Sequence, residues 1–315
     1  ATEHGRTGVE TLFGDYSPAG EEAYAKLVKK TLKKLDKVIP IDDTDLVTLD
    51  AMQERLTLTR QMRRAGLGRW QLNNIFSAPQ QIRTSFDLMS RENERDWAHI
   101  AGRLANVPGA IDGFIQTLEA ARAEGKVSPR RQVQVVIEQA EAYIADGGFF
   151  DALAAEIAAA APAITEQARE GAQAAKDGYR ALITYLRDTL LPEAPSKDAV
   201  GRELYTLYSR ESLGASIDLD ETYAWGVQEL ERIITEQHTV ASEIEPGASI
   251  ERAKELLDMD PVRALHGTEA LQEWMQTHAD TAVEALAGTH FDIGGPMLKI
   301  ECRIAPTHEG GIYYT

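Results

Sequence analysis

The residues best suited to chemistry lie near the C-terminal end, in the run His308-Glu309-Gly310-Gly311-Ile312-Tyr313-Tyr314. Paired glycines let another backbone approach closely, and extended peptides bind exposed strand edges through main-chain hydrogen bonds. The hydroxyls of Tyr313 and Tyr314 beside such an edge can donate to a substrate carbonyl or its oxyanion. A plain hairpin, with glycine required by the turn and tyrosine by strand packing, explains the same residues. The spacing alone favours that simpler interpretation.

Other catalytic signatures are absent from the sequence. None of the seven histidines is four residues from another, and Ile312 stands where a zinc helix beginning at His308-Glu309 would need its second histidine. The glycine-rich phosphate-binding and dinucleotide-binding motifs and the nucleophile elbow are also missing. The single cysteine, Cys302, falls on the apolar face of an alternating segment, which is typical of a buried and inert thiol.

The residues just before and within this C-terminal run have a β-type pattern of apolar and polar residues. Apolar Leu298, Ile300, Cys302 and Ile304 alternate with charged residues, a period that predicts a strand. A loop and a second β-prone run at 312–315 predict a short β-hairpin at 293–315, which we expect to be interrupted by the end of the chain.

The preceding residues carry helical periodicity, so the predicted fold class is mainly α: a large multi-helix array with a short β-hairpin at its C-terminal end. Ser17-Pro18 is typical of a helix start, and Asp218 with Glu221 has the spacing of a capping box. The predicted organisation is a helical region at 1–190, a Pro-containing hinge at 191–200, a second helical region at 201–292 and the β segment at 293–315.

Composition excludes several classes of function. With 50 acidic and 33 basic residues the formal net charge is −17, which repels phosphate backbones and anionic headgroups. We therefore expect no nucleic-acid partner and no membrane partner. One cysteine and no recognisable signal peptide predict a cytoplasmic protein.

The C-terminal run from Ile300 to Thr315 resembles a signature of a bacterial family known as domain of unknown function eight-eight-five. Matching segments occur in the same order along the whole chain. They are Asp15-Tyr16-Ser17-Pro18, Asn106-Val107-Pro108-Gly109, Ser209-Arg210-Glu211, Leu219-Asp220-Glu221-Thr222-Tyr223, Gly267-Thr268-Glu269-Ala270-Leu271 and Gly288-Thr289-His290-Phe291-Asp292.

The resemblance implies a function. The family resembles mostly helical zinc metallopeptidases of the gluzincin type, whose metal motif, of the form HEGxPGHH, follows the segment that ends this chain. It implies that zinc belongs to the full-length protein, that its ligands lie in a C-terminal half of the same enzyme, and that this chain alone holds no metal and is inactive. It also implies that the C-terminal segment binds a peptide substrate, with cleft-lining residues His308, Gly310, Gly311, Tyr313, Tyr314 and Arg303.

Two hypotheses of different classes follow from the sequence. In the first, the chain is the N-terminal portion of a carboxypeptidase- or dipeptidase-like zinc enzyme and supplies the helical walls and substrate strand of its cleft. In the second, it is a non-catalytic helical module that binds another protein through its exposed tyrosine-bearing edge. The half-finished hairpin favours the first.

Overall fold

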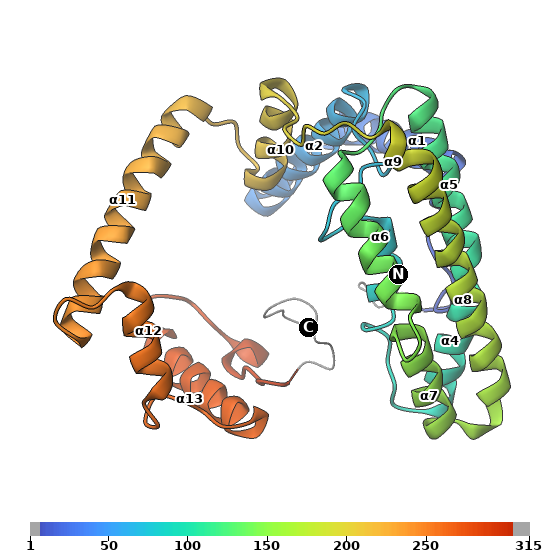
Figure 1. Ribbon diagram of the computed structural model, residues 1–315. Coiled ribbons are helices and arrows are strands. Elements are labelled where there is room, and N and C mark those ends of the chain that lie inside the picture. The colour runs from blue at the N-terminus through green and yellow to red at the C-terminus, as the bar shows by residue number, and fades with distance from the viewer. Residues whose placement is uncertain (1–6, 305–315) are drawn as a thin grey trace. The chain divides into compact units, whose positions relative to one another are not determined.

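The computed structural model describes residues 7–304, and its regular elements are helices (Figure 1). The predicted mainly α fold class is confirmed. The chain divides into two compact units, which we call unit 1 (Ala1–Ile217) and unit 2 (Asp218–Thr315). The stretch at 191–200 that was predicted as a hinge lies within unit 1, where the Arg130 amide donates to the Pro195 carbonyl at 2.8 Å.

Unit 1 is an array of helices joined by short connections. In chain order these are α1 (Pro18–Leu35), α2 (Asp43–Arg64), α3 (Ala78–Thr84), α4 (Glu94–Leu104), α5 (Val107–Ala123), α6 (Arg130–Ile144), α7 (Phe149–Ala160), the 3₁₀ turn η1 (Pro162–Ile164), α8 (Thr165–Tyr185), the π-helical turn η2 (Leu186–Leu190), α9 (Leu191–Glu193) and α10 (Arg202–Leu213).

Helix α8 forms the centre of unit 1, because α4, α5, α6 and α7 all pack against it (Figure 1). Its buried residues Ala168, Ala172, Ala175, Tyr179 and Leu182 recur every three or four positions, which places them on one side of the helix. Small side chains on this stripe let neighbouring helices approach closely. The core of unit 1 is therefore a set of helices around α8.

At Gly171, helix α8 lies close against α4. A Cβ atom built at Gly171 would lie 2.9 Å from the Leu104 Cβ atom and 3.2 Å from the Ala101 carbonyl oxygen. Any larger residue would push the two helices apart.

Helices α1 and α2 pack together as an antiparallel pair on unit 1. The Ser17 hydroxyl accepts the Gly20 amide at the start of α1, and the Asp42 carboxylate accepts the Asp45 amide at the start of α2. These caps satisfy amides that a helix start leaves without partners. The predicted helix start at Ser17-Pro18 is confirmed.

Unit 2 contains α11 (Leu219–Ile244), α12 (Ile250–Met259), α13 (Thr268–Leu286) and the 3₁₀ turn η3 (Gly295–Leu298). Asp218 caps α11 by accepting the amides of Asp220 and Glu221. Among the described residues of unit 2, the buried apolar side chains are those of Ala241 and Ala253. Large apolar residues such as Trp225 are exposed. Unit 2 thus has helices with apolar faces but almost no core of its own.

The predicted strand at 298–304 is not found in the structure. Leu298 ends η3, and residues 299–304 form no regular element. Side-chain amides of α13, rather than a second strand, bind the backbone of this segment, and the alternating Leu298, Ile300 and Ile304 are exposed. The second half of the predicted hairpin, 312–315, lies outside the described residues.

None of the helices within 7–304 combines the length and apolar character needed to cross a lipid bilayer.

Candidate functional site

The predicted cleft residues divide into two groups. His308, Gly310, Gly311, Tyr313 and Tyr314 lie outside the described residues. Arg303 is described, and it lies on the segment that leads directly to them. The site can therefore be built from this segment and from the helix that holds it.

Helix α13 positions the segment through two glutamines. Gln272 and Gln276 are four residues apart, so their side chains lie on the same face of the helix. The Gln276 amide nitrogen donates to the Ile300 carbonyl at 2.7 Å, and its amide oxygen accepts the Cys302 amide at 2.9 Å. Gln272 donates to the Cys302 carbonyl at 2.8 Å. We call this arrangement the glutamine clamp.

Asp280 orients the clamp. One turn further along α13, its carboxylate accepts a second hydrogen bond from the Gln276 amide nitrogen at 2.9 Å. A carboxylate only accepts hydrogen bonds, so it selects the orientation in which the amide nitrogen faces Asp280. The Gln276 amide then offers one donor and one acceptor to the segment, as a neighbouring β-strand would.

The clamp leaves the opposite edge of the segment open. Both backbone groups of Cys302 face α13, and in an extended chain the backbone groups of adjacent residues point the other way. Lys299 has an extended backbone conformation, with φ −118° and ψ 105°. Within the described part of the chain, the backbone groups of Glu301 and Arg303 have no hydrogen-bond partner. The segment therefore presents one edge with free main-chain donors and acceptors.

Arg303 lies on this open edge. Its guanidinium pairs with Glu301 at 2.7 Å, and the two side chains are 75% and 69% exposed. The hydrogen bond from Arg303 lowers the pKa of the Glu301 carboxyl and raises the pKa of the arginine. Because water screens an exposed pair strongly, the guanidinium can exchange Glu301 for another carboxylate at little cost.

Metal-ligating side chains do not converge anywhere in the described range. No three His, Cys, Asp or Glu residues of 7–304 are placed to share an ion. His278 stacks on Trp274 with ring centroids 4.1 Å apart, and its Nδ1 lies 2.9 Å from the Trp274 carbonyl oxygen. The half-buried Cys302 thiol belongs to no group of metal-ligating side chains within the described residues. The residues of 7–304 therefore do not fit a zinc ion.

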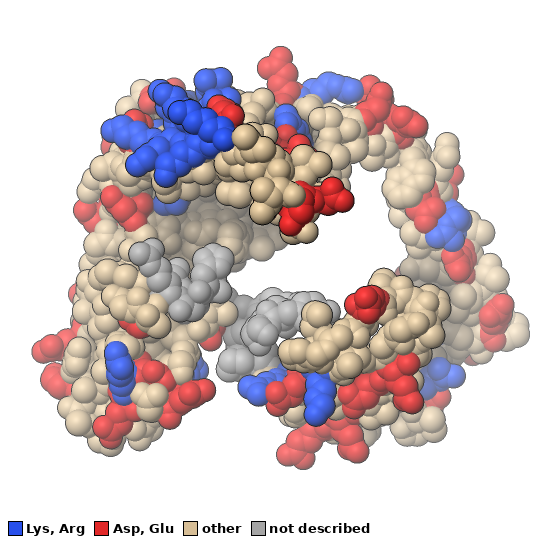
Figure 2. Space-filling view, turned by 180° about the vertical axis from the view of Figure 1, so that it is seen from behind, with Lys and Arg blue, Asp and Glu red and all other residues tan. Residues whose placement is uncertain are grey.

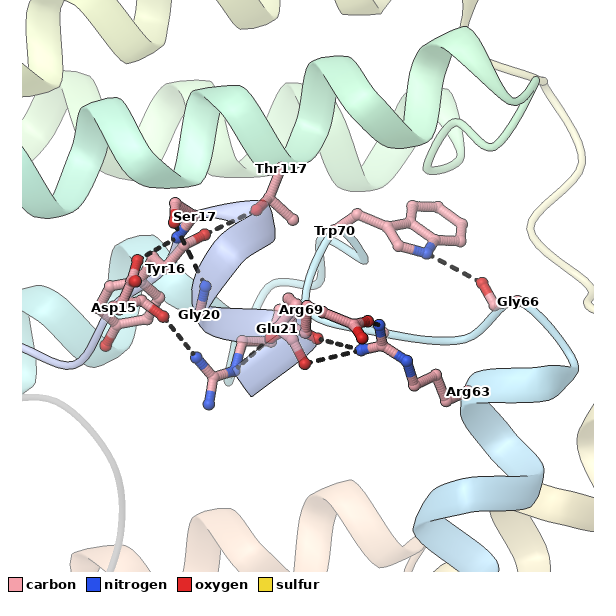
Figure 3. Close-up of polar contacts among 12 residues, drawn as sticks. Asp15, Tyr16, Ser17, Gly20, Glu21, Arg63, Gly66, Arg69, Trp70 and Thr117 are labelled. Carbon is pink, nitrogen blue, oxygen red and sulfur yellow. Dashed lines mark hydrogen bonds and ion pairs between the residues drawn. The ribbon is translucent and has the colours of Figure 1, made fainter. Parts of the chain in front are cut away.

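A second polar cluster, in unit 1, was not predicted from the sequence (Figure 3). The Arg69 guanidinium donates to the Asp15 carbonyl at 3.1 Å and pairs with Glu21 at 3.0 Å, and Arg63 donates to the Glu21 carbonyl at 2.9 Å. The Thr117 hydroxyl of α5 donates to the Tyr16 carbonyl at 2.7 Å.

This cluster has a structural role. The Ser17 amide and hydroxyl hold the Asp15 carboxyl in its charged form and lower its pKa. Because its charged groups are used in joining the start of α1 to α2 and α5, the cluster offers no reactive group. The Asp15-to-Ser17 turn is readable from the sequence, but the distant arginines that complete it carry no local signal.

Comparisons with known proteins agree with this architecture. The model of a family described as "Bacterial protein of unknown function (DUF885)" matches residues 1–315. No curated protein matches the chain.

Two solved structures share the fold. A protein described as a putative lipoprotein from Colwellia psychrerythraea is 14% identical with a TM-score of 0.69, over 88% of this chain and 53% of that protein. A putative lipoprotein of unknown function from Shewanella oneidensis is 12% identical with a TM-score of 0.61, over 98% of this chain and 62% of that protein. This chain thus spans between half and two thirds of the length of each. The match over residues 1–315 shows that the chain belongs to the bacterial DUF885 family.

Proposed function

We propose that this chain is the N-terminal portion of a zinc-dependent peptidase of the carboxypeptidase or dipeptidase type. Its helices form walls of a substrate cleft, and its C-terminal segment holds the peptide. The resemblance noted in the sequence supports zinc chemistry. Since residues 7–304 do not fit a zinc ion, the proposal assigns the zinc ligands to the C-terminal half of the same enzyme.

The observation that carries the proposal is the open edge opposite the glutamine clamp. An extended peptide can pair with the free main-chain groups of Glu301 and Arg303, as peptides do when they add to a sheet edge. Such pairing binds a backbone without selecting its side chains, which suits an enzyme that acts on peptides of varied sequence. The Arg303 guanidinium can then bind the terminal carboxylate of the peptide.

Hydrolysis of short peptides by the intact protein from its native source tests this function. We expect cleavage that a chelator abolishes and zinc restores, and no cleavage by the 315-residue chain alone. Zinc-dependent cleavage by the 315-residue chain would contradict the assignment of the zinc ligands. Absence of cleavage by the intact protein over a broad peptide set would contradict the function.

Arg303→Ala tests the substrate contact. A charge-assisted hydrogen bond at an exposed site predicts a loss of about tenfold in kcat/KM for peptides with a free carboxylate. Peptides ending in an amide should be unaffected. Lys299→Ala is the matched control, since it removes an exposed positive charge four residues away. Equal losses for both classes of peptide would show that Arg303 does not bind the carboxylate.

A non-catalytic binding module is the second candidate. The exposed apolar side chains of α11 and α13, such as Tyr223, Trp225 and Trp274, favour it, because apolar surfaces of this kind usually contact another polypeptide. In the first proposal the C-terminal half of the enzyme covers these faces. In the second a separate protein does, and the intact protein would bind that protein without hydrolysing peptides.

The cellular location also remains a proposal. We propose a cytoplasmic protein on the grounds given by the sequence. The descriptions of both solved neighbours as lipoproteins favour membrane attachment instead. After a high-salt wash of the membranes, recovery of the native protein in the soluble cytoplasmic fraction would support the first location, and retention in the envelope fraction would overturn it.

A further inference from the structure

Helix α1 carries a continuous stripe of lysines. The stripe follows the three- and four-residue spacing that keeps side chains on one face of a helix. All of its members are exposed, whereas Val28 and Leu32 on the other side of α1 are buried against unit 1. We call this surface the lysine face; its members are Lys26, Lys29, Lys30, Lys33 and Lys34 on α1, and Lys37 in the turn that follows it.

The charge of the lysine face is largely uncompensated. Lys26 pairs with Glu22 at 3.8 Å, but the other five lysines form no ion pair within residues 7–304. Asp36 is the one acidic residue between positions 26 and 37. Figure 2 shows Lys and Arg side chains gathered on one face, at the end of unit 1 where Figure 1 draws α1 and α2. A protein of net charge −17 therefore has a local cationic surface.

An apolar tip adjoins the lysine face. In the connection from α1 to α2, Ile39 is 85% exposed and Ile41 is 89% exposed, and they flank Pro40. Two of the three acids that follow take part in capping α2: Asp42 accepts the Asp45 amide at 2.8 Å, and the Asp45 carboxylate accepts the Ile41 amide at 3.3 Å. The third, Asp43, is exposed in the first turn of α2. The tip thus presents two exposed isoleucines that follow Lys37 closely in the chain.

We propose that the lysine face and the apolar tip form a docking surface for an anionic phospholipid bilayer. Lysines attract anionic headgroups at short range, and apolar residues at the end of such a face enter the boundary of the acyl chains. The tip favours a bilayer over nucleic acid as the partner, because nucleic acid has no apolar interior in which the isoleucine side chains could be buried. The lysines of α1, from Lys26 to Lys34, extend over about 12 Å of helix, which suits a flat anionic surface better than a single small phosphate.

The net charge does not prevent this contact. At physiological salt, charges more than about 8 Å from a surface are largely screened. In a contact made through α1 and the tip, the charges within that distance are those of residues 26–45. Six lysines outnumber four aspartates there, so the local charge is positive although the summed charge is negative. The expectation of no membrane partner rests on the summed charge, whereas this proposal rests on the local distribution of charge.

Flotation of the 315-residue chain with lipid vesicles tests the proposal. We expect binding to vesicles of phosphatidylcholine mixed with phosphatidylglycerol, weakening as salt is raised, and little binding to phosphatidylcholine alone. Each lysine near an anionic surface contributes about fivefold to affinity, so replacing three by glutamine predicts a loss of about a hundredfold. The test variant carries Lys30→Gln, Lys33→Gln and Lys34→Gln.

A matched control removes the same charge elsewhere. The substitutions Lys197→Gln, Lys254→Gln and Lys299→Gln change three exposed lysines outside α1 and should leave vesicle binding unchanged. A second variant, Ile39→Ser with Ile41→Ser, should weaken binding at every salt concentration while keeping the salt dependence.

Four results would overturn the proposal. These are no binding to anionic vesicles, equal binding to neutral vesicles, equal losses in the test and control triple variants, and binding of duplex DNA as tight as binding of the vesicles. The readouts do not involve peptide cleavage, so they are independent of the proposed enzymatic function.

Discussion

Replacing Gln276 by alanine should release the segment that carries Arg303. The change removes the 2.7 Å bond to the Ile300 carbonyl and the 2.9 Å bond from the Cys302 amide. A hydrogen bond contributes about 0.5–1.5 kcal/mol net, and these are partly exposed, so their joint loss should cost about 1–2 kcal/mol. That cost raises the population of the released segment about 5- to 30-fold.

Hydrogen exchange at the Cys302 amide measures this release directly. Its proton is the one held by Gln276, so exchange at this position should accelerate about 5- to 30-fold in Gln276→Ala. Gln272→Ala removes one bond, to a carbonyl, and should have a smaller effect. The matched control is Gln237→Ala, an exposed glutamine on α11 that should leave exchange at Cys302 unchanged.

Two checks make this prediction refutable. Circular dichroism should show unchanged helix content in each variant, so that faster exchange reports the segment and not unfolding of α13. If exchange at Cys302 were equally fast in the parent chain, in Gln276→Ala and in the control, the glutamine clamp would not hold the segment. The open edge that supports the proposed function would then lose its basis.

Three further predictions concern the stability of unit 1, measured by chemical denaturation. Lys176, almost buried, donates to both oxygens of Asp151 at 3.0 and 2.9 Å, so Asp151→Asn should cost about 2 kcal/mol near neutral pH. The hydrogen bond from Lys176 holds the pKa of Asp151 below its ordinary 3.8, so the ion pair stabilises the folded state fully above that pH. The difference in unfolding free energy between the parent chain and Asp151→Asn should therefore shrink as the pH falls below 3.8. Tyr179→Phe should cost about 1–2 kcal/mol, because the buried hydroxyl donates to a backbone carbonyl of α3 at 2.6 Å. Gly171→Ala should destabilise the chain by about 1 kcal/mol, since crowding against α4 outweighs the gain in helix propensity. Gly109 has open space around it, so Gly109→Ala should leave the stability unchanged or raise it. If Gly109→Ala destabilised the chain more than Gly171→Ala, the close packing of α8 against α4 would be refuted.

The helices were predictable because their ends carry local signals. Ser17 and Asp218 cap α1 and α11 at the positions where the sequence predicted helix starts. Such signals depend on side chains that bond to amides two or three residues away. Their partners are therefore visible in the sequence itself.

The strand at 298–304 was predicted wrongly because alternating apolar residues indicate a strand only where another element covers their face. Leu298, Ile300 and Ile304 are exposed in the described structure, and the segment is held through its backbone instead. Here Gln272 and Gln276 take the place of a strand, and no residue near 298–304 indicates that its partners lie 24 to 30 residues earlier in the chain. Only the three-dimensional structure shows that pairing.

Part of the candidate site could be predicted and part could not. Arg303 was singled out from the sequence and lies on the open edge. The clamp that exposes this edge was missed, because two glutamines on an acidic, exposed helix carry no distinctive signal. The link from Arg210 to Glu54, which joins α10 to α2 through a 2.6 Å bond across 156 residues, was beyond prediction for the same reason.

Native mass spectrometry of the protein as its own source produces it tests the central claim most directly, since it gives the polypeptide mass and any bound metal together. The account predicts a polypeptide of about twice 34.7 kDa that carries zinc and loses it to a chelator. A polypeptide of 34.7 kDa without zinc would contradict the account and leave the binding module as the remaining function.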